Sequence, residues 1–244
     1  MASQDLDEDE LAAYLHLTPQ QVRKLADRGK LPGRRVSSSW RFSEAEIHNW
    51  LEQKIGASED GEELSKVEKV LDRWNKKHMD SSFEWDSTIL SLIPAEAVEI
   101  PFAARTRGSV VRRICANAEK TGLLWDAHKM AEAVTAREEL HTTALDNGVA
   151  LLHPRRPQAS LLGEPFLALG VSPQPIPFGN QSGHLTDTFF LICSTEERMH
   201  LQVLAKLSRL LTTEGFLSQL RASSDAKEGL ELIARFEEEL DGDD

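Results

Sequence analysis

A short apolar segment that ends on a histidine constrains this chain more than any other feature. The segment Gly148–Leu152 has the length and composition of a buried strand. Pro154 follows closely, and because proline cannot continue a strand ladder, regular structure must stop there. We therefore expect the ring of His153 to lie at the end of a strand.

His153 and a second histidine, His200, are the residues best suited to chemistry. Near neutral pH an imidazole offers a lone pair without an activating base, so it can accept a phosphoryl group and pass it on. Such a transfer needs little beyond correct positioning. The two histidines predict a phosphoryl-accepting site, although His200 taken alone is better explained as a residue that caps or decorates the helix predicted over 201–211.

The segment from Arg137 to His153 resembles a motif of a known family. It contains Arg-Glu-Glu, then Thr143, then Asn-Gly-Val-Ala, and ends on His153. It is similar to the EIIA domains of the fructose, mannitol and nitrogen-regulatory type in the bacterial phosphotransferase system, over about 89–240. In that family the histidine matching His153 accepts phosphate from the carrier HPr, and the residues matching His200 and Arg137 lie at the same pocket. The resemblance implies a mixed sheet flanked by helices.

One residue departs from the family pattern. Where the family usually has proline directly before the phosphorylated histidine, this chain has Leu152, and Pro154 follows the histidine instead. Because proline fixes a backbone torsion, this exchange can re-aim the ring. A scaffold that has lost phosphotransfer therefore stays open as an alternative.

The composition is that of a soluble globular protein, with 244 residues, 40% hydrophobic and 28% charged. The acidic N-terminus and the short apolar runs predict a cytoplasmic protein without membrane segments. Cys115 and Cys193 are expected to be buried thiols rather than a disulfide or a metal pair. His128, His141 and His184 have polar neighbours and no metal spacing. We expect neither a metal nor a cofactor.

The net charge of −12 is unevenly distributed. Acids collect in the first ten residues, at 59–63 and at the C-terminal end, whereas 20–41 holds seven basic residues and one acid, Asp27. An evenly acidic surface would repel nucleic acid, but a local basic segment is suited to phosphate contacts. The alternative is an ordinary solvated face.

Two short helices joined by a tight turn are predicted near the N-terminus. Apolar spacing indicates a first helix over 8–17. Thr18 and Gln21 form a capping box that starts a second helix, and Gly29 ends it. This order is typical of a helix-turn-helix.

A basic hairpin is expected next, over 34–42, and Ser43 with Glu46 then predicts the capped start of a third helix. The whole order is similar to the winged-helix domains of excisionase and MerR-type proteins, over about 8–54. The resemblance implies that this part of the chain binds DNA.

In such a domain the exposed side of the second helix faces the major groove, and the wing holds phosphates or reaches the minor groove. The residues expected on the helix are Gln20, Gln21, Arg23 and Lys24. The residues expected in the wing are Arg34, Arg35, Ser38, Ser39 and Arg41. One module offers few contacts, so useful affinity is expected from two copies at paired half-sites.

An acidic connector is expected between this module and the rest of the chain. The segment 56–61 has linker composition, and 62–77 carries a narrow apolar stripe suited to a two-helix seam. The stripe is too short to decide between a homodimer seam and packing onto the chain's own domains. A second loop is expected at 80–86.

Helices and strands alternate beyond the connector. Strands are expected at 97–101, 149–152, 166–171 and 188–193, and helices at 109–121, 126–140 and 201–211. This order predicts a sheet covered by helices. The expected fold class is α/β (α+β), with a winged helix-turn-helix domain over 1–55, an acidic linker and amphipathic helix over 56–86, and an EIIA-like domain over 87–244.

Three functions fit this organisation. The first is a DNA-binding regulator whose His153 is phosphorylated by an HPr-type carrier, so that a new charge of about two units links phosphotransferase-system status to transcription. The second is an enzyme-class phosphocarrier that passes phosphate from His153 to a separate EIIB component. The third is a DNA-binding scaffold with an inactive EIIA-like domain.

Overall fold

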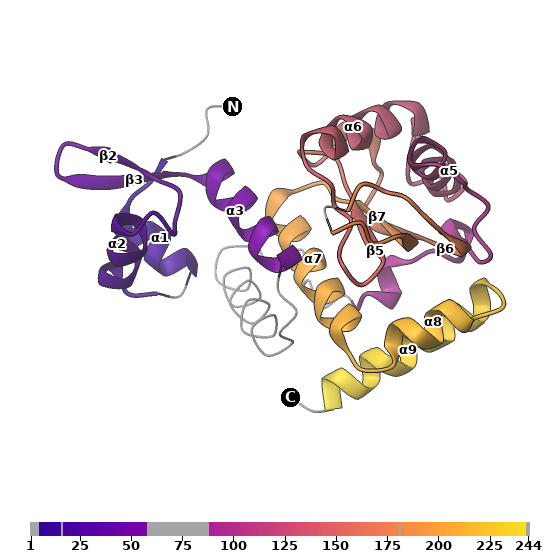
Figure 1. Ribbon diagram of the computed structural model, residues 1–244. Coiled ribbons are helices and arrows are strands. Elements are labelled where there is room, and N and C mark those ends of the chain that lie inside the picture. The colour runs from indigo at the N-terminus through magenta and orange to yellow at the C-terminus, as the bar shows by residue number, and fades with distance from the viewer. Residues whose placement is uncertain (1–4, 16, 58–87, 181, 243–244) are drawn as a thin grey trace. The chain divides into compact units, whose positions relative to one another are not determined.

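The chain divides into two compact units, Met1–Trp85 and Asp86–Asp244. In Figure 1 the described part of the first is indigo to violet, and that of the second runs from magenta to yellow. The computed structural model describes residues 5–15, 17–57, 88–180 and 182–242. The helix predicted over 62–77 and the loop predicted over 80–86 lie outside these described residues.

The first unit is a helix-turn-helix followed by a small sheet and a third helix. Over its described residues, 5–15 and 17–57, the helices are α1 (Glu8–Leu15), α2 (Pro19–Asp27) and α3 (Glu44–Ala57). Its strands are β1 (Asp5–Leu6), β2 (Arg34–Val36) and β3 (Ser39–Ser43), arranged in the antiparallel order β1-β3-β2. The hairpin of β2 and β3 is the predicted wing.

The start of α2 follows the predicted capping box. The Gln21 backbone N–H donates to the Thr18 hydroxyl at 3.3 Å, and the Gln21 side-chain oxygen accepts from the Thr18 backbone N–H at 2.8 Å. These bonds satisfy two donors that a helix start leaves unpaired. Leu11 of α1, Val22 of α2 and Ile47 of α3 are fully buried, which confirms the predicted inner face of each helix.

The second unit is built on a mixed four-stranded sheet. The strands are β4 (Val98–Glu99), β5 (Val149–Leu152), β6 (Phe166–Ile176) and β7 (Thr186–Cys193), in the order β4-β6-β7-β5. The central pair β6–β7 is antiparallel, whereas β4 runs parallel to β6 and β5 runs parallel to β7. The predicted fold class of a sheet flanked by helices is confirmed.

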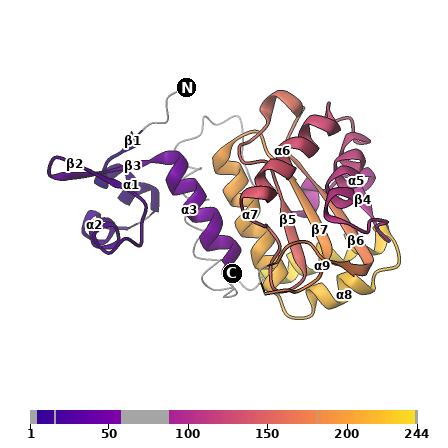
Figure 2. The same ribbon diagram turned by 45° about the horizontal axis from the view of Figure 1, so that its top comes forward.

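Helices cover both faces of this sheet. They are α5 (Arg107–Glu119), α6 (Ala127–Leu140), α7 (Glu197–Thr212), α8 (Phe216–Ala222) and α9 (Ala226–Gly242), with short 3-10 turns at Leu90–Leu92, Ala95–Ala97 and Ala159–Leu161. Figures 1 and 2 show α5 and α6 on one face and α7, α8 and α9 on the other. Among the described helices, none has the length and apolar character needed to span a membrane.

The alternation of side chains along β5 sets the direction of its last residues. Ala150 and Leu152 belong to the core that α5 and α6 close over one face of the sheet. Because successive side chains of a strand point to opposite faces, Leu151 and the following His153 point to the other face, where α7 lies. The alternation along β5 therefore places His153 on the face of the sheet that α7 covers.

Both cysteines are buried free thiols, as expected. Cys115 lies in α5 and Cys193 is the last residue of β7. Burial raises the pKa of the Cys115 thiol to about 12. This thiol is therefore protonated and unreactive near neutral pH.

Several boundaries differ from those expected from the sequence. The strand predicted over 97–101 contains only Val98–Glu99, because Pro101 has no N–H to give to a ladder. Strand β6 continues past 171 to Ile176 after a register shift. His200 does not precede its helix but lies inside α7, which begins at Glu197, since an acidic residue is favoured in a first turn. Helices α8 and α9 were not predicted.

Candidate functional site

The parallel pairing of β5 and β7 brings two chain segments to one edge of the sheet. Leu152 at the end of β5 lies opposite Leu191 of β7, so the carboxyl ends of both strands meet there. His153 follows β5 directly, and Ser194 follows β7 directly. Helix α7 begins shortly after Ser194 and carries His200.

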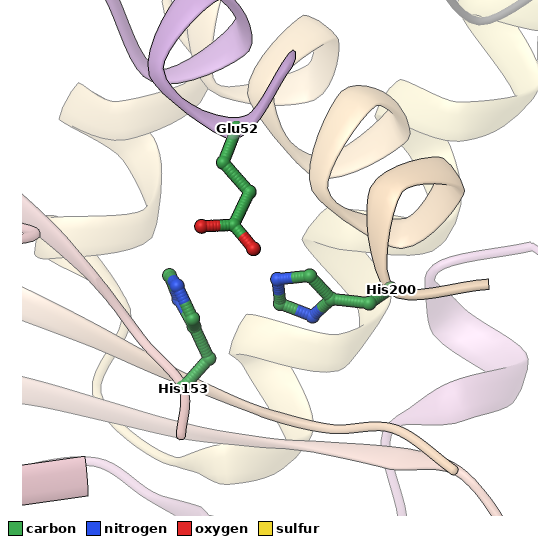
Figure 3. A group of neighbouring side chains, drawn as sticks. All are labelled: Glu52, His153 and His200. Atoms are coloured by element: carbon green, nitrogen blue, oxygen red, sulfur yellow. The ribbon is translucent and has the colours of Figure 1, made fainter. Parts of the chain in front are cut away.

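The rings of His153 and His200 are neighbours, as Figure 3 shows. Their centroids are 4.7 Å apart and their planes are inclined by 55°. Both residues are buried, with 3% of His153 and 5% of His200 exposed. The structure thus brings together the two histidines that the sequence analysis selected.

A hydrogen bond determines which nitrogen of His153 carries the lone pair. Nδ1 lies 2.8 Å from the backbone oxygen of Leu151. A carbonyl oxygen can only accept, so Nδ1 must be the protonated nitrogen. In the neutral ring Nε2 is then the nucleophilic atom.

Ser194 is a member of this site that the sequence analysis missed. Its buried hydroxyl lies 3.3 Å from Nδ1 of His200, and its carbonyl accepts from the backbone N–H of Gln158 at 3.2 Å. Ser194 therefore links His200 to the loop that follows His153. The available signal was its position as the first polar residue after an apolar strand.

The outer edge of β5 is covered by the segment Thr143–Leu145. Ala144 and Ala150 form an antiparallel bridge. Leu145 N donates to Val149 O at 2.8 Å, and Leu151 N donates to Thr143 O at 3.3 Å. This short hairpin extends the pairing around the strand that leads to His153.

Glu138 anchors that segment from the end of α6. One carboxylate oxygen accepts from Thr143 N at 3.0 Å and also from the Thr143 hydroxyl, while the other pairs with Arg107 at 3.2 Å. Burial raises the pKa of Glu138 above its usual value, because the loss of water outweighs the hydrogen bonds from Thr143 and the charge of Arg107. Glu138 belongs to the Arg-Glu-Glu motif, but no role was predicted for it.

A tight turn at Leu145–Gly148 precedes β5. Gly148 adopts a φ of +83°, and its N–H donates to Leu145 O at 3.3 Å. Arg221 of α8 donates to Asn147 O at 2.5 Å and to Asp187 at 2.8 Å. The beginning of β5 is therefore held from the side of α8.

The guanidinium of Arg137, the third residue predicted for this site, donates to the carbonyl of His141 at 2.8 Å, at the end of α6. Its place at the predicted phosphoryl-accepting site stays a prediction. Arg155 and Arg156, which follow His153, are exposed. His128 and His184, to which no role was given, are exposed and lie 3.6 Å and 3.5 Å from carboxylates.

The predicted DNA-contacting residues of α2 are all exposed, but two of them have partners within the fold. They are Gln20, Gln21, Arg23 and Lys24. The side-chain oxygen of Gln21 caps the helix, as described above. The guanidinium of Arg23 pairs with Glu8 of α1 at 2.6 Å.

The wing presents its basic residues on both faces. Arg35 lies opposite Trp40, with its guanidinium carbon 5.9 Å from the ring centre, and Arg34 lies opposite Arg41. Asp5 pairs with Arg34, and Asp7 lies 3.7 Å from Arg41. The predicted residues Ser38 and Ser39 are exposed.

Comparison with known proteins identifies the larger unit. Residues 91–236, more than half of the chain, match the family model of the phosphoenolpyruvate-dependent sugar phosphotransferase system, EIIA 2. The chain belongs to this family. Residues 6–55 match the model of a helix-turn-helix domain.

Relatives of the EIIA domain include proteins of different length. The nitrogen regulatory protein of Bradyrhizobium diazoefficiens is 30% identical over 149 residues, which are 60% of this chain and 94% of that protein. The PTS system fructose-specific EIIABC component of Bacillus subtilis is 25% identical over 147 residues, 59% of this chain and 23% of that protein. The chain therefore spans less than a quarter of the second relative.

Solved structures share the fold. The nitrogen regulatory protein IIA-Ntr of Neisseria meningitidis has a TM-score of 0.54 at 21% identity, covering 59% of this chain and 98% of that one. The mannitol IIA protein of Escherichia coli has a TM-score of 0.52 at 21% identity, covering 57% and 97%. The same mannitol protein in complex with phosphorylated enzyme IIB has a TM-score of 0.51, again at 21% identity, covering 59% and 99%.

Proposed function

We propose that this chain is a DNA-binding regulator whose EIIA domain accepts a phosphoryl group on His153 from an HPr-type carrier, linking phosphotransferase-system status to transcription. The observation that carries the proposal is the hydrogen bond of 2.8 Å from His153 Nδ1 to Leu151 O. It leaves Nε2 as the nitrogen with the lone pair, in a site that also holds the ring of His200.

The transfer makes one bond and breaks one. The Nε2 lone pair of His153 attacks the phosphorus of the carrier's phosphohistidine, and the bond from phosphorus to the carrier's nitrogen breaks with its electron pair left on the carrier. No proton needs to leave Nδ1. Because the acceptor ring gains positive charge, its hydrogen bond to Leu151 strengthens as the product forms. His200 would donate a hydrogen bond to the new phosphoryl group, and Arg137 would offset part of its charge.

Intact-mass measurement tests this proposal directly. The full-length protein is incubated with phosphoenolpyruvate, enzyme I and HPr. We expect an acid-labile gain of one phosphoryl group that His153→Ala abolishes and His200→Ala slows. His128→Ala is the matched control, since that histidine is exposed on α6 and should behave as wild type. No gain with the wild-type chain would contradict the proposal.

A scaffold without phosphotransfer is the second candidate, and the burial of the two rings favours it. Only 3% of His153 and 5% of His200 are exposed, whereas a donor must bring its own ring into line with Nε2. Leu152 in the place of proline also favours a scaffold without phosphotransfer. Under this candidate, DNA binding persists while the mass of the wild-type chain stays unchanged at any carrier concentration.

A phosphocarrier role is distinguished by a second step. The related mannitol IIA protein was solved together with a phosphorylated IIB enzyme, so transfer onward to a separate EIIB component is the corresponding proposal here. Adding EIIB to the phosphorylated chain would then discharge His153. A phosphoryl group that stays on His153 would favour the regulator.

For the first unit we propose that α2 enters the major groove of DNA and that the wing contacts the backbone. Gln20 and Lys24 are the proposed groove contacts of α2, together with Gln21 and Arg23 where DNA can compete with their partners in the fold. In the wing, Arg35 is the main proposed contact to the DNA backbone. The further proposed backbone contacts are Arg34, Arg41, Ser38 and Ser39.

A fluorescent duplex containing the promoter beside the protein's own gene tests this part. We expect Arg35→Ala to weaken binding and to flatten its salt dependence, because a phosphate contact is lost. Arg112→Ala, at an exposed position of α5, is the control and should leave binding unchanged. Binding that ignores both Arg35→Ala and salt would exclude the proposed surface.

We further propose a cytoplasmic protein divided into a DNA-binding domain over 1–55, a connector over 56–86 and the EIIA domain over 87–244. Two copies at paired half-sites would supply the contacts that one module lacks. Size-exclusion chromatography with light scattering, with and without the duplex, measures the number of chains in the free protein and in the complex. A complex that contains one chain per site would exclude the homodimer.

A further inference from the structure

The hydrogen-bond ladder on the outer edge of β5 is interrupted at one position. Thr143 and Leu151 face each other, and Leu151 N donates to Thr143 O at 3.3 Å. Such a pair in an antiparallel ladder normally exchanges two bonds, so the regular partner of Leu151 O would be Thr143 N–H.

Both of those groups have taken other partners. Thr143 N donates to Glu138 at 3.0 Å, and Leu151 O accepts from His153 Nδ1 at 2.8 Å. A backbone N–H has a single hydrogen, and at 3.0 Å that hydrogen is committed to Glu138. Leu151 O has two lone pairs and could accept from both groups, but a shared acceptor binds each donor more weakly. The carboxylate therefore spares Leu151 O from being shared between Thr143 N–H and His153.

Glu138 is itself held firmly. Its residue is 2% exposed, and it accepts from the Thr143 hydroxyl in addition to the backbone N–H. Its second oxygen pairs with Arg107 of α5 at 3.2 Å. With partners on both oxygens, the carboxylate has one defined orientation.

We propose that Glu138 is a positioning residue for phosphoryl transfer, because by binding Thr143 N–H it keeps the Leu151 carbonyl available to hold His153 in the Nδ1–H tautomer. The link to transfer rests on the proposed function. Without an acceptor at position 138, Thr143 N–H turns to Leu151 O and completes the ladder. Because Leu151 O then shares its acceptor capacity, its bond to Nδ1–H weakens and the ring of His153 populates both tautomers. In one of them Nε2 carries a proton and cannot attack.

The test compares Glu138→Leu with Glu138→Gln in the full-length protein. Glutamine keeps a carbonyl oxygen for Thr143 N–H, whereas leucine removes every acceptor at similar size. Long-range ¹⁵N NMR of the His153 ring should show the Nδ1–H tautomer in the wild type and in Glu138→Gln, and a tautomer mixture in Glu138→Leu. The phosphorylation rate should fall by about 10- to 100-fold in Glu138→Leu and recover in Glu138→Gln.

Glu99→Leu is the matched control for general destabilisation. Glu99 is also a carboxylate that binds an arginine of α5 and a backbone N–H, through Arg113 and Ala103. It lies on β4, at the opposite edge of the sheet from β5. This variant should lose stability and keep the His153 tautomer.

A folded Glu138→Leu protein with an unchanged His153 tautomer would overturn the inference. If that variant does not fold, the inference is tested in the wild-type protein, by NMR couplings across the hydrogen bond that the Thr143 amide donates. A coupling from the Thr143 amide to the Leu151 carbonyl, in place of one to Glu138, would equally overturn it. If the wild-type protein is not phosphorylated, the proposed function is wrong, but the effect of Glu138 on the His153 tautomer is still tested. The tautomer is measured without any phosphoryl donor.

Discussion

Glu8 joins three elements of the first unit through one carboxylate. It lies in α1, accepts from Trp40 N of β3 at 3.1 Å and pairs with Arg23 of α2 at 2.6 Å. The hydrogen bond from the Trp40 backbone, with that from Arg23, holds the pKa of Glu8 below its usual value in spite of its burial. Arg23 therefore supports the packing of the helices in addition to its proposed contact with DNA.

Substitutions at two neighbouring positions of α2 should separate these roles. Arg23→Ala should lower the urea midpoint of the first unit, since it leaves Glu8 without its guanidinium. Lys24→Ala should leave the midpoint unchanged and reduce the slope of DNA affinity against salt by about one, the loss of one phosphate contact. Urea titration and fluorescence anisotropy measure the two effects. Equal midpoints for both variants would exclude the structural role of Arg23.

Gly148→Ala should destabilise the second unit. Gly148 has a φ of +83°, and an added Cβ would lie 2.6 Å from Arg221 Nη2 and 3.3 Å from Leu185 O. The backbone conformation alone costs about 1–2 kcal/mol for a residue with a side chain. Gly122→Ala is the control, because Gly122 has a similar φ of +74° and nothing within 4 Å. Urea unfolding should therefore show a larger loss in the free energy of unfolding for Gly148→Ala than for Gly122→Ala. Equal losses would mean that the contacts of the added Cβ with Arg221 and Leu185 have no energetic cost.

The candidate site was predictable from the sequence only in part. His153 and His200 were found through a strand that ends on a histidine and a family motif. Ser194 and Glu138 escaped, because their roles depend on the pairing of β5 with β7 and on the approach of α6 to Thr143. Contacts of this kind join residues whose spacing follows no helical or strand period.

At the scale of elements, β1 reduces a charge conflict in the wing. Arg34 and Arg41 lie directly opposite each other, an arrangement that repels. Asp5 of β1 and the adjacent Asp7 pair with them. The acidic N-terminal segment therefore stabilises the basic hairpin, and it would compete with DNA phosphates for the same guanidinium groups in the proposed complex.

Asp5→Asn should strengthen DNA binding and steepen its salt dependence, because Arg34 is then available to phosphate. Asp9→Asn removes the same charge at an exposed position of α1 and serves as the control for net charge. Fluorescence anisotropy over a range of salt concentrations compares the two. If Asp9→Asn raises the affinity as much as Asp5→Asn does, only net charge matters.

Glu99→Gln should make stability less dependent on pH. Burial raises the pKa of Glu99, but hydrogen bonds from Arg113 and Asn117 outweigh it and bring the pKa below 4.5. A lowered pKa stabilises the fold above the unfolded value, and this contribution is lost as the pH falls through the folded value. The variant should lose about 1–3 kcal/mol at neutral pH. Urea unfolding should show this difference narrowing below pH 4.5, and a constant difference would contradict the assignment.

The elements with a clear apolar period were predicted well, and the irregular ones were not. Helices α2, α5 and α6 and strand β5 lie close to their expected bounds. Helices α8 and α9 were missed, since they were not distinguished from the acidic C-terminal stretch. The extension of β6 to Ile176 was missed because its register shift breaks the alternation on which a strand prediction depends.

At the scale of the molecule, the two compact units should unfold separately. Trp40 and Trp50 report on the first unit and Trp125 on the second. Arg23→Ala should move only the transition of the first unit, and Glu99→Gln only that of the second. Calorimetry with tryptophan fluorescence measures both transitions. A single transition that shifts with either variant would show that the chain unfolds as one cooperative body.

The fold class was predictable because two independent patterns, a winged helix-turn-helix and an EIIA motif, each lie within one compact unit and span most of its described elements. The proposed link between phosphorylation and DNA binding has no such basis in the sequence, since coupling requires an element with two states and no local pattern encodes one.

The hydrogen bond from Arg221 to the Asn147 carbonyl has a consequence for synthesis on the ribosome. The two residues are separated by 74 positions, so the acceptor strand emerges well before the arginine that fastens its first turn. A nascent chain that already contains His153 therefore still lacks the contact that holds the first turn before β5. The site proposed to accept a phosphoryl group can therefore be complete only after α8 has left the exit tunnel.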